Sequence, residues 1–168
     1  SDAYLNYLPV NDLETGSIYW NSWGGLNDVM RQDDEVLGAE MAEWGFGGIS
    51  STFNTDMRAS SQWKQSKISY ALTNRNYRNR IMATWSTGLL PSGWAISLSG
   101  SRRWAQEGFV EGTYYDAWSY FASIDKRFNE HHSLNLVVLG APYQRGGSST
   151  SVQETYDISA DNYYNSFW

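Results

Sequence analysis

The sequence predicts an all-β protein, in which an antiparallel up-and-down meander forms part of a large transmembrane β-barrel. Three observations predict this architecture. Residues 80–100 form two runs of strict apolar–polar alternation around a turn that contains Gly88, Pro91, Ser92 and Gly93. The same alternation recurs along the chain and gives about five strands from residue 65 onward. The turns after the second and fourth strands are short, the connections after the third and fifth are long, and the connection after the first is shorter than these two.

The hairpin at residues 80–100 has one apolar face and one small, polar face, because side chains alternate between the two faces of a strand. Two environments suit such a hairpin. A soluble sheet buries the apolar face in a protein core. A transmembrane barrel turns the apolar face to lipid and the polar face to its lumen. The hairpin alone is compatible with both.

The lengths of the connections favour the barrel. The turns at 88–93 and 129–132 are short, whereas the connections after the third and fifth predicted strands are long. In an up-and-down meander every second connection lies at the same end of the sheet. Short turns therefore gather at one end and long loops at the other, as in outer-membrane barrels.

The apolar face of these strands is predicted to face lipid. Aromatic residues lie near both ends of the strands, with aliphatic residues between them, which is the pattern of two aromatic girdles. Trp85 and Trp94 flank a short turn, while Trp104, Tyr115 and Trp118 lie toward the long loops. The residues predicted to face lipid are Ile68, Tyr70, Leu72, Ile81, Trp85, Trp94, Ile96, Leu98, Trp118, Tyr120, Ile124, Leu134, Leu136 and Val138.

The opposite face is rich in small hydroxyl side chains and has few charges in mid-strand. Its members are Ser69, Thr73, Thr84, Ser86, Ser97, Ser99, Ser119 and Ser123. The outer face of a soluble sheet is expected to carry charges, whereas small hydroxyls suit a wall that faces a polar lumen or an inserted plug. A soluble, aromatic-rich β-domain that binds carbohydrate on its Trp and Tyr side chains is the alternative.

The composition argues against several classes of protein. A net charge of −6 argues against a nucleic-acid partner, because such proteins present a basic surface. The chain has no Cys, which excludes a disulfide framework and a thiolate metal site. It also has no run of about 18 apolar residues, so no transmembrane helix is predicted.

No set of residues with catalytic or metal-binding spacing is found. His131 and His132 are adjacent in a predicted tight turn, where neighbouring side chains point apart. The acidic run Asp33-Asp34-Glu35 lacks the alternating ligand spacing and the glycine of a calcium loop, and a solvated loop is predicted there. We therefore expect no enzymatic activity, no metal site and no cofactor.

Several motifs, taken in order, resemble the TonB-dependent outer-membrane receptors of Bacteroidota, in the branch with a carboxypeptidase-regulatory-like domain before the plug. The run WGGLNDVMR at 23–31 resembles a late plug segment. Gly47-Gly48-Ile49, which precedes a short alternating run, resembles the end of the plug and the start of the barrel. The runs at 70–80 and 97–104 resemble the first barrel strands.

The resemblance implies a barrel of about 22 strands filled by a plug domain, located in the outer membrane of a Gram-negative bacterium. It implies energised nutrient uptake driven by the TonB complex. Residues 1–60 would be the C-terminal part of the plug, and residues 61–168 the first five or so strands with their outer loops. Because five strands cannot close such a barrel, the chain is expected to be an excerpt. Its expected partners are outer-membrane lipid, the remainder of its own barrel and a possible surface lipoprotein.

Ligand contacts are expected from the outer loops. The candidates are Tyr114, Tyr115, Tyr143, Arg145, Tyr163, Tyr164 and Trp168. The alternative role for each is packing within the loops or in the outer aromatic girdle. A further alternative for the whole chain is an outer-membrane barrel without a plug, in which residues 1–60 would form a strand or a linker.

Overall fold

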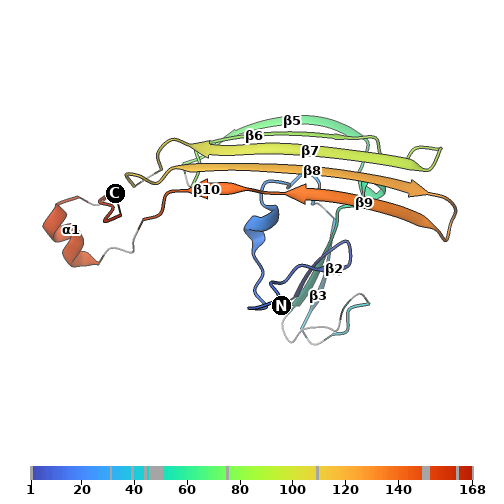
Figure 1. Cartoon of the computed structure of the whole chain (residues 1–168), viewed down its shortest axis with the longest axis horizontal. Coiled ribbons are helices and arrows are strands. Elements are labelled where there is room, and N and C mark those ends of the chain that lie inside the picture. Colours follow the sequence, from blue (N-terminus) through green and yellow to red (C-terminus); the bar gives the residue numbers. More distant parts are fainter. Residues whose placement is uncertain are drawn as a thin grey trace.

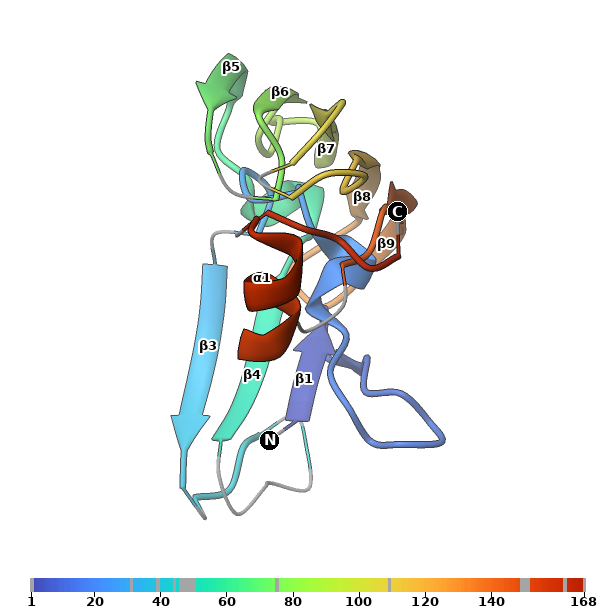
Figure 2. The same ribbon diagram turned by 90° about the vertical axis from the view of Figure 1, so that its left-hand side faces the viewer.

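The computed structural model of the chain contains two β-sheets. It describes residues 2–30, 32–38, 40–43, 45, 51–74, 76–108, 110–148, 152–161 and 163–167. The larger sheet runs along the length of the molecule, and the smaller sheet projects from one side of it (Figure 1). Seen end-on, the larger sheet is an arc, and the smaller sheet lies on its concave side (Figure 2). The larger sheet therefore has a convex face and a concave face.

The larger sheet is an antiparallel meander of long strands, each paired with the next in sequence. A short strand, β10, pairs with β8 beyond the end of β9. The strands are β5 (Gln65–Leu72), β6 (Asn79–Ser86), β7 (Trp94–Ala105), β8 (Tyr115–Arg127), β9 (Ser133–Gly140) and β10 (Tyr143–Arg145). The predicted β class and antiparallel meander are confirmed, and β6 and β7 form the predicted hairpin. Within the described residues, β5 and β9 are edge strands, so the sheet is open.

The smaller sheet has mixed topology, in the order β2-β1-β4-β3. Its strands are β1 (Asp2–Leu5), β2 (Leu8–Pro9), β3 (Gln32–Leu37) and β4 (Ser51–Asp56). β1 pairs with β4 in parallel across nearly fifty residues of sequence, whereas β3 pairs with β4 antiparallel. The motif at 47–49 that resembles the end of a plug lies outside the described residues.

The acidic run at 33–35 is part of a strand, so the predicted loop is wrong there. Asp33, Asp34 and Glu35 belong to β3, at the edge of the smaller sheet, and all three are exposed. Acidic residues are uncommon in strands, but an edge strand keeps them in water, where they also oppose pairing with another chain. Asp33 further accepts a hydrogen bond of 2.6 Å from the Thr55 hydroxyl on β4.

Short helices complete the described chain. They are the 3-10 helices η1 (Trp20–Trp23) and η2 (Ala59–Ser61) and the α-helix α1 (Gln153–Ser159). The boundary predicted between residues 60 and 61 falls inside η2, the connection from the smaller sheet to the larger one. α1 and β10 lie in the C-terminal region that the sequence presents as polar and without periodicity. No helix in the described part of the chain is long and apolar enough to cross a membrane.

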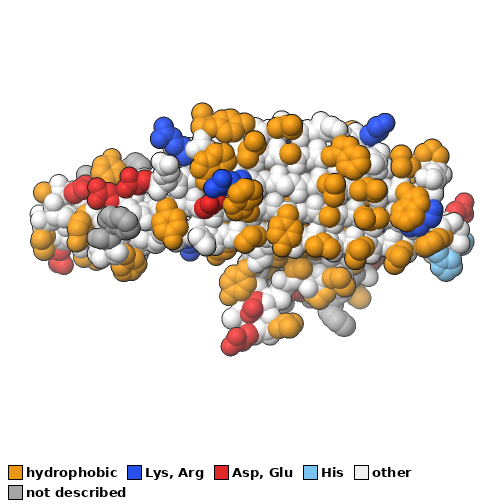
Figure 3. All heavy atoms as spheres, turned by 45° about the horizontal axis from the view of Figure 1, so that its top comes forward, with side chains coloured by type: hydrophobic (Ala, Val, Ile, Leu, Met, Phe, Trp, Pro, Cys, Tyr) orange, Lys and Arg blue, Asp and Glu red, His pale blue; other side chains and the backbone are white. Residues whose placement is uncertain are grey.

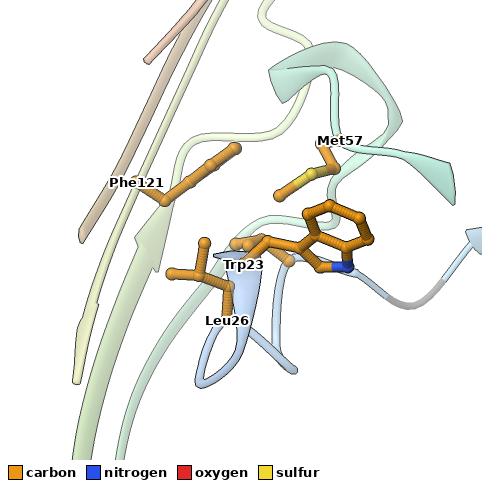
Figure 4. Packing of buried hydrophobic residues seen from close by; sticks show 5 residues of the cluster. Trp23, Leu26, Met57 and Phe121 are labelled. Carbon is orange, nitrogen blue, oxygen red and sulfur yellow. The ribbon is translucent and has the colours of Figure 1, made fainter. Parts of the chain in front are cut away.

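The hydrophobic core lies between the two sheets. Trp23, Leu26, Val29 and Met57 come from the smaller sheet and its connections, and Phe121 comes from the concave face of β8. Figure 4 shows the Phe121 ring pointing from its strand toward Met57 and Leu26. Phe121 is only 3% exposed. It is the buried side chain that the larger sheet contributes to this core, and Val137 and Leu139 of β9 pack against the core as partly buried neighbours.

The core position of Phe121 predicts a large loss of stability on truncation. Phe121→Ala is expected to lower the free energy of unfolding by about 3–5 kcal/mol, because it removes a buried ring and leaves a cavity. Tyr120→Ala is the matched control, since Tyr120 is the next residue of β8, lies on the convex face and is 54% exposed. Thermal unfolding followed by tryptophan fluorescence measures both. Equal losses of unfolding free energy in Phe121→Ala and Tyr120→Ala would contradict the placement of Phe121 in the core.

Candidate functional site on the concave face of the larger sheet

The convex face of the larger sheet carries all fourteen residues that were predicted to face lipid. Thirteen are exposed, and Ile96 is half-buried. Cross-strand pairing arranges them in rows, so that Ile96, Ile124 and Leu136 lie opposite one another on β7, β8 and β9. Figure 3 shows hydrophobic side chains spread over this face. Monomeric soluble proteins rarely expose an apolar surface of this extent, so the face calls for an apolar partner.

A cation beside tryptophan rings lies at each end of the convex face. Toward the long loops, the Arg102 guanidinium carbon lies 4.7 Å from the Trp118 ring centre and 5.3 Å from the Trp104 ring centre. Toward the short turns, the Lys126 amino group lies 4.9 Å from the Trp94 ring centre. Long cationic side chains place their stems on apolar surface and their charge at its border, and tryptophan favours the same border. The two ends thus frame the apolar surface between them.

Tyr115 does not lie on the convex face with Trp118. The two residues are three apart in β8, and an odd separation in a strand places side chains on opposite faces. The Tyr115 ring lies on the concave side, with its centre 6.0 Å from the Tyr77 ring centre. It also lines a hollow at the long-loop end. The grouping of Tyr115 with the outer aromatic girdle was therefore wrong, while its selection as a candidate ligand residue stays a prediction.

The concave face holds the smaller sheet through hydrogen bonds to backbone groups. Around η2, the Ala59 N–H donates to the Ser123 hydroxyl at 2.9 Å, and the Ser60 N–H donates to the Asp125 carboxylate at 2.8 Å. Ser123 and Asp125 are both buried. Short side chains on the wall let a backbone segment come close enough to be bonded directly, and the bonds satisfy N–H groups that water does not reach.

Gly24 and Gly25 make the closest approach of the smaller unit to the wall. The Ser101 hydroxyl donates to the Gly25 carbonyl at 2.8 Å, and the Ser119 hydroxyl donates to the Gly24 carbonyl at 2.5 Å. A Cβ atom on Gly25 would lie 2.5 Å from the Ser119 Oγ atom and 2.8 Å from the Ser101 Oγ atom. Gly25 also has a φ of +92°, in the region that favours glycine. Both the space and the backbone conformation therefore require glycine here.

An Asp–Arg pair shapes the segment that leads into η2. The Arg58 side chain donates to both oxygens of the Asp56 carboxylate, at 2.9 and 2.6 Å. The Arg58 N–H donates to the same carboxylate at 3.0 Å. Burial by itself raises the pKa of Asp56, but the hydrogen bonds and charge of Arg58 outweigh it, so the pKa of Asp56 lies below its ordinary value. The ionised carboxylate thus holds the chain just before Ala59 and Ser60 meet the wall.

A hollow of about 550 Å³ opens at the long-loop end of the concave face. It lies between the connections that follow β5, β7 and β10. Among the described residues, its side-chain lining combines tyrosine rings, asparagine amides, hydroxyls and the Arg145 guanidinium, and none of these lining residues is a carboxylate. The polar lining residues are Asn74, Asn76, Thr113, Tyr114, Tyr115, Arg145 and Ser148. Such a surface offers hydrogen bonds, ring faces and positive charge to a polar ligand.

The structure brings only some of the predicted ligand residues together. The three that line the hollow are Tyr114, Tyr115 and Arg145. The three that lie outside its lining are Tyr143, Tyr163 and Tyr164. Tyr143 is on β10, and the other two follow α1. Trp168 lies outside the described residues.

Sequence reasoning missed Asn74, Asn76 and Thr113 in the hollow, and it missed Arg80 and Arg103 on the concave face. The asparagines lie in the polar, turn-like run 74–79, and such residues are common in turns whether or not they bind a ligand. The arginines carried a usable signal, because alternation in the Arg102-Arg103 pair requires one side chain on each face. Which arginine of another strand lies opposite Arg103 depends on the register, and this is visible only in the structure.

Comparison with known proteins gives no match. No family model matches the chain, and no curated protein or solved structure matches it. The proposals below therefore draw on the residues of this chain and on their geometry.

The close approach at Gly25 predicts a crowding effect. Gly25→Ala is expected to destabilise the protein by about 1–3 kcal/mol beyond the cost of its positive φ, because the new methyl group overlaps two serine hydroxyls. Gly16→Ala is the matched control, since Gly16 has a φ of +67° and nothing within 4 Å of an added Cβ. Thermal unfolding compares the two. Adding Ser119→Ala to Gly25→Ala should recover part of the loss, and no recovery would argue against the crowding.

The lowered pKa of Asp56 predicts an acid-sensitive contribution to stability. A carboxyl whose folded pKa is depressed stabilises the protein above its unfolded pKa of about 3.9 and loses that effect as pH falls through the folded pKa. Asp56→Asn is expected to cost about 1.5–3 kcal/mol at neutral pH and to flatten the pH dependence of stability below about pH 4. Asp34→Asn, at an exposed carboxylate of β3, is the control. Urea midpoints at several pH values measure the effect, and an unchanged slope in Asp56→Asn would contradict it.

Proposed function

We propose that this chain is a segment of a TonB-dependent outer-membrane transporter for energised nutrient uptake. In this proposal the larger sheet is part of the barrel wall and the smaller sheet is part of the plug. The observation that carries it is the two-sidedness of the larger sheet. Its convex face is apolar and exposed, while its concave face is lined with hydroxyls that are hydrogen-bonded to a folded unit.

The height of the apolar surface supports a membrane location. Trp104 and Trp94 mark its two ends on β7, ten residues apart. At about 3.3 Å per residue this is about 33 Å along the strand, and a tilt of about 40° reduces the height to about 25 Å. The apolar band of outer-membrane barrels has about this height. The cation and tryptophan at each end would then lie at the two borders of the hydrocarbon.

The curvature, the open edges and the connections of the larger sheet support its place in a barrel wall. The larger sheet is curved, and the smaller sheet lies on its concave side (Figure 2). Two edge strands with free backbone groups would be satisfied by further strands of the same wall. The turns at 87–93 and 128–132 lie at one end of the sheet, and the connections at 73–78 and 106–114 lie at the other.

The two alternatives fit the structure less well. A soluble carbohydrate-binding module would leave the convex face in water, where an apolar surface of this size promotes aggregation. A barrel without a plug requires a strand or a linker over residues 1–60. The described part of this region instead forms a four-stranded sheet that shares a core with Phe121.

Spin labelling tests the proposed location, and the 168 residues of this segment contain no Cys that would compete with an introduced one. Nitroxides are placed one at a time along β8 at residues 118–124, in the protein as it resides in the outer membrane. Labels at the even positions are expected to collide with oxygen dissolved in lipid. Labels at the odd positions, which face the smaller unit, are expected to be shielded. A label at Glu35, which is exposed on the smaller sheet, is the aqueous control.

Two relaxation agents, dissolved oxygen and a water-soluble nickel chelate, separate the outcomes. Lipid contact gives high accessibility to oxygen and low accessibility to a water-soluble nickel chelate. Convex positions that respond to the nickel chelate as strongly as the Glu35 control would overturn the membrane proposal and favour the soluble module. Odd positions that are open to the chelate would overturn the plug assignment and favour the barrel without a plug.

A further inference from the structure

Two arginines lie directly opposite each other on the concave face of the larger sheet. Arg80 on β6 is the register partner of Arg103 on β7. Side chains at directly opposed positions of an antiparallel pair are the nearest cross-strand neighbours, and like charges there are destabilising. Small hydroxyls from Thr84, Ser99, Ser101 and Ser119 lie on the same face nearby. Two positive charges at this position therefore need a compensating interaction.

The interactions that these arginines make within the described residues are all with neutral groups. The Arg80 guanidinium donates to the Asn27 side-chain oxygen at 3.2 Å and lies 3.4 Å from the Met82 sulfur. The Arg103 guanidinium donates to the Gly24 carbonyl at 3.1 Å. The Nε atoms of both arginines are buried and have no hydrogen-bond partner among the described residues. Donor capacity and charge are thus both left over.

The carboxylates close to this pair are bound to other cations. Asp28, beside Asn27, pairs with Lys67 at 2.9 Å. Asp116 pairs with Arg102 at 3.0 Å on the convex face. Arg102 and Arg103 are adjacent in sequence, yet only the one that faces outward has a carboxylate partner in the described part of the chain. The difference marks the concave pair as a place where an anion from outside the chain would bind.

Tyrosine rings connect the arginine pair to the hollow. The Arg103 guanidinium carbon lies 6.0 Å from the Tyr77 ring centre and 5.8 Å from the Tyr115 ring centre. Tyr115 is at the same time part of the lining of the hollow, together with Arg145. The two rings flank the guanidinium, whose planar set of N–H donors matches planar or tetrahedral oxyanions in bidentate contacts. Arg145, Arg103 and Arg80 therefore provide positive charge from the hollow to the concave face.

We infer that Arg80 and Arg103, with Arg145 at the hollow, form a binding site for the acidic group of an anionic ligand, namely a carboxylate, sulfate or phosphate. This inference rests on the proposed function, because it assigns the site to the cargo of the transporter. The net charge of the whole chain is −6, so the site is a local departure from the general charge. Neutral molecules of the same size would gain none of the charge-assisted hydrogen bonds.

Thermal stability of the full-length protein that contains this segment, purified in detergent and chloride buffer, tests the site. The probes are a galacturonate disaccharide, glucose 6-sulfate, glucose 6-phosphate and, as the neutral control, glucose. The anionic probes are expected to raise Tm in a saturable and salt-sensitive manner, and glucose is expected not to. The probes that succeed tell whether the site takes carboxylates, tetrahedral anions or both.

Variants of the arginine pair make the test specific. Arg103→Gln and Arg80→Gln are expected to weaken anion binding roughly tenfold to a hundredfold, as for the loss of a charge-assisted hydrogen bond. Arg80→Gln is also expected to raise Tm without anion, because it relieves the repulsion. Arg102→Gln, next to Arg103 but on the convex face, is the matched control and should leave anion binding unchanged.

Three results would overturn the inference. The first is that glucose raises Tm as much as the anionic probes do. The second is that Arg102→Gln weakens anion binding as much as Arg103→Gln does. The third is that Arg80→Gln has a lower Tm than the unsubstituted protein when no anion is present. The last would mean that another group already neutralises the pair. The spin-label experiment fails or succeeds independently, because it reports the environment of the convex face. If the convex-face labels contact lipid but the anionic probes do not bind, the anion site is rejected and the proposed function is kept.

Discussion

The close contact between backbone and serine-lined wall is the constraint on which the rest of this structure depends. Gly24 and Gly25 can meet the wall only because Ser101 and Ser119 are small, and because residue 25 has no Cβ. A larger side chain at Gly25, Ser101 or Ser119 would push the two sheets apart. It would also leave backbone carbonyls buried without donors, at a cost of about 1–3 kcal/mol each.

This constraint explains the composition of the long strands. On β7 and β8 the concave side is small and polar where it receives backbone groups, so the apolar residues of these two strands are concentrated on the other side. The mean hydropathy of the whole chain is −0.54, because polar sides and polar connections are averaged with the apolar face and hide it. An ordinary half-buried sheet packs its apolar side, whereas here the polar side is packed and the apolar side is exposed.

The sequence predicted the larger sheet well, because its information is local. A period of two over eight or more residues specifies a strand and its faces, and turn residues such as Gly93 and Asn129 separate the strands. The smaller sheet carries no such signal. Its strands are short, its edge is acidic, and β1 finds its parallel partner about fifty residues away. In the candidate site, Tyr114, Tyr115 and Arg145 were predicted as loop residues, but the pairing of Arg80 with Arg103 requires the register.

A face of serines cannot by itself determine where the smaller unit sits, because one serine row offers the same hydroxyls as the next. A one-residue slip within the wall itself would turn its apolar face inward, so the pairing of the wall strands is specified. A shift of the smaller unit along the wall turns no side chain to the other face, so it must be opposed by individual contacts. Phe121 enters the core, Asp125 accepts from the Ser60 N–H, and Lys67 pairs with Asp28. These three contacts come from β8 and β5, on both sides of the serine rows, and together they fix one position on an otherwise repetitive wall.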